Sequence, residues 1–189
     1  MWSKDETEVM IKDSVIKQRF SRMMATNYMG AFCLTKALLP LLENSPVPSR
    51  VVNVSSFTHR NVCLILFSYE LNRQIVLMQK SHRVSVVVAD PGAVKTNIMR
   101  EIPSHISQIA LLSLRILGIL QSPDIGVRSI LDAALAPPEI TGVYFFGGNG
   151  TTIKSSALSY DTKLSKDLWN ASIEMFRDLQ LSSSTNASM

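Results

Sequence analysis

The sequence predicts an α/β fold in which a small parallel sheet is covered by helices on both faces. Short runs of apolar, mostly β-branched residues occur at 50–54, 84–89 and 142–146, and turn residues bound them. Long stretches of helical apolar spacing separate these runs, as right-handed crossovers between parallel strands require. The runs are apolar almost without interruption, which is typical of strands buried on both faces.

The helices are expected between and around these strands. Their apolar spacing places them at residues 8–44, 62–80, 104–120, 123–136 and 161–179. Ser122 fits an N-cap with Pro123 at the first helical position, and Pro137-Pro138 ends that helix. We expect one domain over residues 1–180 and a flexible serine-rich tail at 181–189.

Composition excludes several classes of function. Apolar residues make up 46% and charged residues 18% of the 189 residues, which is a globular composition. The net charge of +4 is spread thinly along the chain, so we expect no nucleic-acid partner. Two cysteines without a CxxC pair, and three histidines far apart in sequence, predict free thiols and no metal site.

The termini and the longest apolar stretch bear on localisation. The N-terminus is charged and lacks the apolar core of a signal peptide, so we expect an intracellular protein, cytoplasmic or membrane-peripheral. Residues 106–120 are apolar but too few to span a bilayer, and they include Arg115. Two interpretations stay open for this stretch: a helix that packs on the sheet or covers a pocket, and a helix on a membrane surface.

Ligands of parallel α/β sheets bind beyond the carboxyl ends of the strands. Two loops there carry candidate residues. Ser55-Ser56 follows the first strand, and the loop 90–96 (DPGAVKT) follows the second. Taken alone, the serines are better explained as partners of strand-end backbone groups, and the loop is equally well explained as an ordinary turn. A glycine in such a loop also lets backbone approach a flat ring closely.

The ordered set of segments resembles the short-chain dehydrogenase/reductase family. It comprises NYMG at 27–30, RVVNVSS at 50–56 and DPGAVKT at 90–96, and it is most similar to the branch of retinol dehydrogenases and WW-domain oxidoreductase. The resemblance implies the C-terminal half of a Rossmann-type doubly wound parallel sheet, with about three strands plus helices. It also implies an NADP or NAD cofactor and a small-molecule alcohol or ketone as substrate.

Site residues follow from the resemblance, position by position. Asn27 corresponds to the asparagine that supports the proton-relay water, and Ser56 to the serine that polarises the substrate carbonyl. The residues that correspond to the contacts of the nicotinamide carboxamide are Pro91, Gly92, Val94 and Thr96. The helices expected over 104–136 correspond to the substrate-side lid.

Two features of the family are missing from the sequence. No TGxxxGxG turn, the helix N-terminus that binds the pyrophosphate, occurs before residue 30. The YxxxK acid/base pair is also missing, and Asn61 occupies the expected lysine position. Tyr69 and Arg73 have the right spacing but lie roughly 10 Å too far along the helix, and arginine stays protonated.

These departures favour a catalytically incompetent member of an oxidoreductase family over an active enzyme. Such a chain would be a fragment or a splice product. An alternative is a non-catalytic interaction protein or a peripheral membrane protein that uses residues 106–120. With half of the sheet absent, the strand 50–54 becomes an edge, so we expect a marginal monomer. Such a chain would associate as a homo-oligomer or with a full-length relative.

Overall fold

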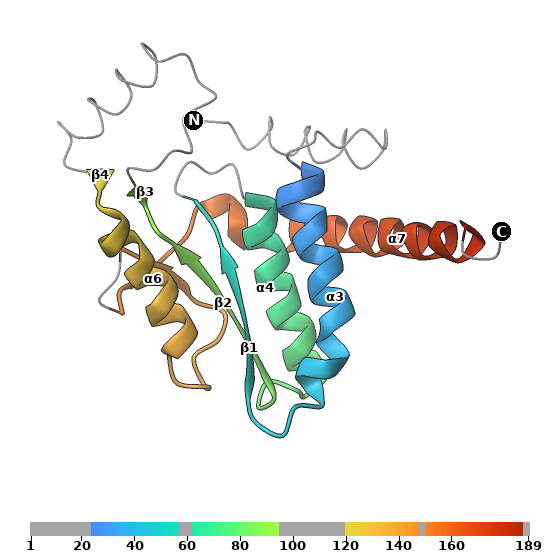
Figure 1. The fold of residues 1–189 in the computed structure, drawn as a ribbon, viewed down its shortest axis with the longest axis horizontal. Helices are drawn as coiled ribbons and strands as arrows, with labels where there is room; N and C mark the ends of the chain where they lie inside the picture. Colours follow the sequence, from blue (N-terminus) through green and yellow to red (C-terminus); the bar gives the residue numbers. More distant parts are fainter. Residues whose placement is uncertain (1–23, 57–61, 95–119, 148–149, 187–189) are drawn as a thin grey trace, which may run out of the picture.

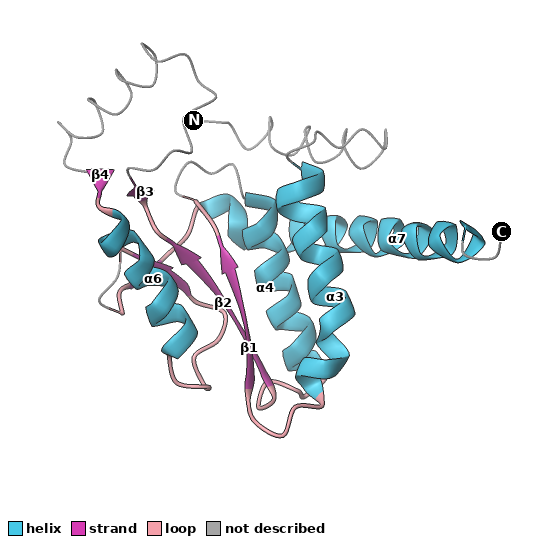
Figure 2. Cartoon of the chain, viewed as in Figure 1, coloured by secondary structure: helices cyan, strands magenta, loops and turns pink. Residues whose placement is uncertain are grey.

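A computed structural model describes residues 24–56, 62–94, 120–147 and 150–186 of the chain. It confirms the α/β class: a mostly parallel sheet lies between helices (Figure 2). The start of the predicted helix 8–44 and most of the predicted helix 104–120 lie outside the described residues.

The main sheet has the strand order β1-β2-β5-β6. β1 (Ser49–Val54), β2 (Val84–Asp90) and β5 (Tyr144–Phe146) are parallel and correspond to the three predicted strands. β6 (Thr152–Ile153) pairs antiparallel with β5 and was not predicted, because two exposed residues carry no apolar pattern. All seven residues of β2 are buried, as expected for a strand covered on both faces.

Helices cover both faces of this sheet (Figure 1). α3 (Gly30–Glu43), preceded by the π-helical turn η1 (Ala25–Met29), lies with α4 (Val62–Leu77) on one face. α6 (Pro123–Leu135) covers the other face, where it packs on Val87 and Ala89. The Ser122 side chain accepts a hydrogen bond from the Ile125 backbone, which confirms the predicted N-cap.

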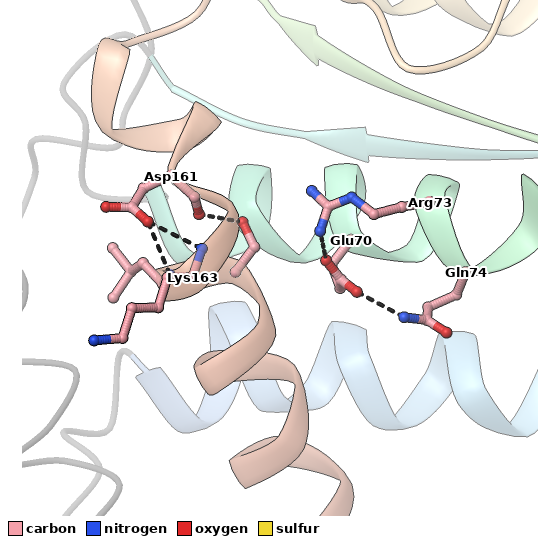
Figure 3. A network of polar contacts seen from close by, with 7 residues as sticks. Glu70, Arg73, Gln74, Asp161 and Lys163 are labelled. Atoms are coloured by element: carbon pink, nitrogen blue, oxygen red, sulfur yellow. Dashed lines mark hydrogen bonds and ion pairs between the residues drawn. The ribbon is translucent and has the colours of Figure 1, made fainter. Parts of the chain in front are cut away.

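The last helix, α7 (Thr162–Asn186), follows the 3₁₀ turn η3 (Ala157–Tyr160) and crosses the outer side of α4 (Figure 1). Asp161 caps it by accepting hydrogen bonds from the backbone of Lys163 and Leu164 at 3.1 and 3.0 Å (Figure 3). The helix continues to Asn186, beyond the predicted end at residue 179 and into the segment expected to be a tail.

The N-terminal half of α4 is buried on all sides, because the sheet lies on one side and α7 on the other. Phe67 is the centre of the contact: its ring stacks on Trp169 of α7 at 5.9 Å and contacts Phe32 of α3 at 5.1 Å. Tyr28 closes the cluster and bonds Ser172 of α7 at 2.7 Å. This packing explains why the run VCLILF is apolar throughout instead of showing a helical stripe.

Arg50 joins the edge strand β1 to the carboxyl end of α6. Its guanidinium donates to the carbonyls of Ala133, Ala136 and Pro137 at 2.9, 2.6 and 2.6 Å, and its Nε donates to Ser85 Oγ at 2.8 Å. The last carbonyls of a helix have no partner within the helix, so a cation there satisfies both the hydrogen bonds and the helix dipole.

Within the described residues, β1 is an edge strand, as the sequence predicted. Val54 at its end is 45% exposed. The neighbouring helix α3 exposes a stripe of three leucines spaced by four and three residues, at Leu34, Leu38 and Leu41. Strand β1 therefore lies beside an apolar face of α3 that no described residue covers.

Two more predicted helix ends were wrong. Leu120 was placed at the end of a helix, but it belongs to β4 (Leu120–Gln121), which pairs in parallel with β3 (Ala93–Val94). A two-residue strand produces no periodicity, and its pairing partner lies more than 25 residues away in the sequence. The predicted helix 62–80 also ends earlier, at Leu77, before Gln79 with a φ of 56°.

Candidate functional site

The carboxyl ends of β1, β2 and β5 form one edge of the sheet. The Ser55 backbone N–H donates to the Ala89 carbonyl at 2.8 Å, which extends the ladder by one residue beyond β1. Ser55 and Ser56 therefore lie beside the start of the loop that follows Asp90. The topology brings together the two loops that the sequence singled out (Figure 1).

Asp90 fixes the turn that contains Pro91 and Gly92. Its carboxylate is fully buried, and Oδ1 accepts the Gly92 backbone N–H at 2.7 Å. Oδ2 accepts the hydroxyl of Tyr144 from the neighbouring strand β5. Gly92 has a φ of +72°, a conformation that side-chain-bearing residues rarely adopt. The carboxylate thus holds a glycine turn at the end of β2 in one defined conformation.

Burial and the adjacent Asp90 carboxylate both raise the pKa of the Tyr144 phenol, with burial the larger cause. The Ser55 hydroxyl is near enough to oppose this rise, but its geometry is not that of a hydrogen bond, and Ser55 Oγ has no hydrogen-bond partner among the described residues. Ser55 is 4% exposed, so its hydroxyl is a buried donor and acceptor at the sheet edge. Ser56, next along the chain, is partly exposed.

Gln121 enters the site through the short β3–β4 pair, in which Val94 and Gln121 are partners. A Cβ placed on Gly92 would lie 3.5 Å from each of Cδ, Oε1 and Nε2 of Gln121, so the side-chain amide packs against this glycine. Gln121 Oε1 is buried and has no hydrogen-bond partner among the described residues. No sequence pattern pointed to Gln121, since its role depends on a strand pairing that only the fold creates.

The first turn of α6 also contacts the loop. A Cβ on Gly126 would lie 2.4 Å from Val94 Cγ2 and 3.3 Å from the Pro91 carbonyl oxygen. Only glycine allows the helix to approach the loop this closely. Pro91, Gly92 and Val94 are therefore held from two sides, by α6 and by the Asp90 carboxylate.

The other predicted site residues lie apart from this loop or outside the described structure. Asn27 is exposed on η1, next to the buried Tyr28. Figure 1 shows this helix end at the same end of the molecule as the tips of β1 and β2. Thr96 and Asn61 lie outside the described residues.

Tyr69 and Arg73, the pair with YxxxK-like spacing, point to unrelated partners. The Tyr69 hydroxyl bonds Ser155 Oγ at 2.8 Å, and its ring stacks on Tyr160 with centroids 5.3 Å apart. Arg73 forms an ion pair with the buried Glu70, as Figure 3 shows. These contacts agree with the expectation that the two residues are not the acid/base pair.

The described residues contain neither a membrane-crossing helix nor a cluster of metal-binding side chains. No helix among them is both long and apolar enough to cross a membrane. No group of three or more His, Cys, Asp or Glu side chains in this part of the chain is arranged to hold a metal ion.

Comparison with known proteins identifies the family. The sequence model of short chain dehydrogenases matches residues 7–107, more than half of the chain. The chain belongs to the short-chain dehydrogenase family. This agrees with the resemblance stated above and with the mostly parallel α/β sheet. Members of this oxidoreductase family typically bind NAD(P) and act on alcohols or ketones.

The curated relatives include dehydrogenases of lipid alcohols. Human polyprenol dehydrogenase is 30% identical over 199 residues, which cover 88% of this chain and 58% of the relative. Retinol dehydrogenase 12 from Bos taurus is 27% identical, with 82% of this chain and 54% of the relative covered. Retinol dehydrogenase 14 from Mus musculus is 28% identical, with coverages of 81% and 52%. The chain thus spans a little more than half the length of these relatives.

The described residues fit the nicotinamide end of a dinucleotide. A positive-φ glycine in a clamped turn offers close backbone approach to a flat ring. Two buried oxygens without partners, Ser55 Oγ and Gln121 Oε1, lie at the same sheet edge. Buried polar groups nearly always have hydrogen-bond partners. These two oxygens are therefore suited to accept hydrogen bonds from a ligand at this edge of the sheet.

Proposed function

We propose that this chain provides the nicotinamide and substrate side of an NAD(P)-type oxidoreductase site for alcohols or ketones. The observation that carries the proposal is the Asp90 carboxylate, which holds Gly92 in a left-handed turn beside Ser55 and Ser56. Bound nicotinamide would supply a hydride donor or acceptor. The residues of this chain would position that ring and a substrate oxygen beside it.

Each retained residue has a separate role in this proposal. Gly92, which has no side chain, would let the backbone approach the nicotinamide ring closely, and Pro91 restricts the turn that contains it. Val94, together with Thr96 of the same loop, would flank the nicotinamide carboxamide. The Ser56 hydroxyl would donate a hydrogen bond to the substrate oxygen, and Asn27 would support water on the α4 side.

We further propose that the chain by itself does not turn over a substrate. Between Ser56 and the buried start of α4 at Val62, the sequence is FTHRN, with neither tyrosine nor lysine. Tyr69 is held by Ser155 and Tyr160. The Tyr144 phenol is buried and bonded to the Asp90 carboxylate. We infer that proton transfer to the substrate oxygen lacks a donor of matched pKa.

The relatives' names suggest a long-chain lipid alcohol or its carbonyl form as the substrate class. Polyprenol and retinol dehydrogenases are the proteins to which most of this chain is similar. NADP and NAD both remain candidates for the cofactor, because the described residues do not include a ribose-selecting side chain.

A non-catalytic interaction is the second candidate function. The edge strand β1 and the leucine stripe of α3 favour it, because an exposed edge and apolar helix face together form a template for association. Under this alternative the same fold would act through a homo-oligomer or a complex with a full-length relative.

Saturation-transfer NMR with NADPH and with NADH tests the proposed binding mode. We expect transfer mainly to nicotinamide protons and less to adenine protons. Gly92→Val should abolish the nicotinamide signal, because its side chain would occupy the space against Gln121 in a strained backbone. Arg83→Met is the matched control, because the Arg83 guanidinium donates to the Ser45 carbonyl at 3.2 Å in a solvent-exposed hydrogen bond. Equal transfer to adenine, or no effect of Gly92→Val, would show the proposal to be wrong.

Turnover is tested separately, with all-trans-retinal and NADPH, by the absorbance of the reduced cofactor. We expect no rate above the protein-free blank. A measurable rate that disappears in Ser56→Ala would contradict catalytic silence while leaving the binding proposal intact.

A further inference from the structure

Gln121 carries an unpaired hydrogen-bond acceptor at the sheet edge where the nicotinamide site is proposed. Its Oε1 is shielded from water and has no hydrogen-bond partner among the described residues. Leaving a buried carbonyl unpaired is unfavourable, and such groups in native structures call for an explanation. The Gln121 residue as a whole is only half-buried, so a small shift of its side chain would expose Oε1 to a donor group of a ligand and satisfy this acceptor.

The orientation of the Gln121 amide determines which of its atoms can form hydrogen bonds with a ligand. A Cβ on Gly92 would be equidistant, at 3.5 Å, from Cδ, Oε1 and Nε2 of Gln121. A point equidistant from these three atoms lies above the face of the amide, so Gly92 packs on the face. Gly147, at the end of β5, borders the nitrogen: a Cβ there would lie 3.9 Å from Nε2. Hydrogen bonds of an amide lie in its plane, so the hydrogen-bonding edge of Gln121 does not point into Gly92.

The edge of a glutamine amide has one donor and one acceptor side by side. A primary carboxamide has the complementary pair, an N–H donor and a carbonyl acceptor. Rotation of the Gln121 amide by 180° exchanges its two atoms and still leaves one donor beside one acceptor. An alcohol could contact both atoms only through a single oxygen and therefore with bent hydrogen bonds, and a carboxylate would place an oxygen against Oε1.

We propose that Gln121 recognises the primary carboxamide of the nicotinamide ring, accepting its N–H at Oε1 and donating from Nε2 to its carbonyl. This inference rests on the proposed function. It assigns carboxamide recognition to a side chain on β4, in addition to the backbone of the loop that follows Asp90. The β3–β4 pairing supplies the placement, since it fixes Gln121 opposite Val94.

Nicotinamide mononucleotide and its 3-acetylpyridine counterpart are the probes for this proposal. The second molecule replaces the amide –NH₂ by a methyl group and keeps the carbonyl. Both are titrated against the 189-residue chain in two-dimensional ¹⁵N NMR, with the Gly92 amide signal as the readout. The variants are Gln121→Leu, which removes the amide edge, and Gln74→Leu on α4, a matched control whose amide bonds Glu70. Far-UV circular dichroism confirms that each variant is folded.

The proposal predicts an analogue-dependent effect. Wild type and Gln74→Leu should bind nicotinamide mononucleotide about tenfold more tightly than the acetylpyridine analogue, which corresponds to about 1.4 kcal/mol. Gln121→Leu should lose most of this tenfold difference, and the loop backbone accounts for what remains. If Gln121→Leu still distinguishes them tenfold, the inference is wrong but the nicotinamide site stands.

Two other outcomes also overturn the inference. If Gln121→Leu weakens binding of cyclohexanol and leaves the mononucleotide unaffected, Gln121 contacts the substrate and not the cofactor. If no probe shifts the Gly92 signal of the wild type at millimolar concentration, the proposed function fails, and the inference fails with it.

Discussion

Arg50→Met tests how the edge strand and α6 are held together. Methionine keeps most of the aliphatic stem and removes the guanidinium. Four of the lost hydrogen bonds are 2.9 Å or shorter, to Ser85 Oγ and to the carbonyls of Ala133, Ala136 and Pro137. At about 1 kcal/mol net each they sum to about 4 kcal/mol. Regained side-chain freedom and rehydration of the exposed carbonyls offset about 1–2 kcal/mol.

The expected loss is therefore about 2–3 kcal/mol in the free energy of unfolding, or about 4–12 °C in the melting temperature for a domain of this size. Urea denaturation followed by tryptophan fluorescence measures it, and the slope with urea concentration should not change. Arg50→Lys should lose roughly half as much, because an ammonium lacks the planar fork that spans several carbonyls.

Arg83→Met is the control, since the Arg83 guanidinium makes one 3.2 Å bond to the exposed Ser45 carbonyl. It should change the free energy of unfolding by less than about 0.5 kcal/mol. The reasoning about Arg50 is refuted if Arg50→Met and Arg83→Met unfold at the same urea concentration.

Three further predictions concern the core and the site. Gly126→Ala should lower the free energy of unfolding by about 0–2 kcal/mol in urea titrations, because overpacking against Val94 outweighs the gain in helix propensity; a clear stabilisation would contradict the contact. Burial raises the pKa of Cys63 to about 12, so at pH 8 its thiol should react with Ellman's reagent only as the protein unfolds, whereas the part-exposed Cys33 reacts in the native state. Because the pKa of Tyr144 is raised in the folded protein, its stabilising contribution is complete below about pH 10, the pKa in the unfolded chain, and is lost as the pH rises further. Tyr144→Phe should therefore flatten the decline of the free energy of unfolding at alkaline pH by up to about 1.4 kcal/mol per pH unit. An unchanged slope would refute this prediction.

The parts of the fold that the sequence predicted are those with a local physical cause. β2 was predictable because every residue from Val84 to Ala89 suits a strand buried on both faces. The start of α6 was predictable because Ser122 and Pro123 are an N-cap and a first-turn residue. In both cases neighbouring residues alone determine the conformation.

What the sequence did not predict depends on contacts between distant residues. Asp90 looked like a turn residue, and only the pairing of β2 with β5 brings the Tyr144 hydroxyl to its carboxylate. Gln121 belonged to no pattern, since β4 is two residues long and pairs with β3 across a long connection. Arg50 stands at the start of a predicted strand, and its hydrogen bonds to the carboxyl end of α6 depend on where that helix ends. Family resemblance identified the loop of Pro91 and Gly92, but not the groups that hold it.

α6 links the stability of the fold to the geometry of the site, because its two ends meet different partners. The helix is about 20 Å long. Arg50 holds its last turn, and Gly126 in its first turn lies against Val94 and the Pro91 carbonyl. Fraying of the last turn should not reach the first, so Arg50→Met should lower stability and leave the Gly92 amide signal in place. Gly126→Ala should move that signal at a small cost in stability. If both variants shift the Gly92 signal equally, α6 moves as a rigid body, and the carboxyl end of the helix also positions the loop.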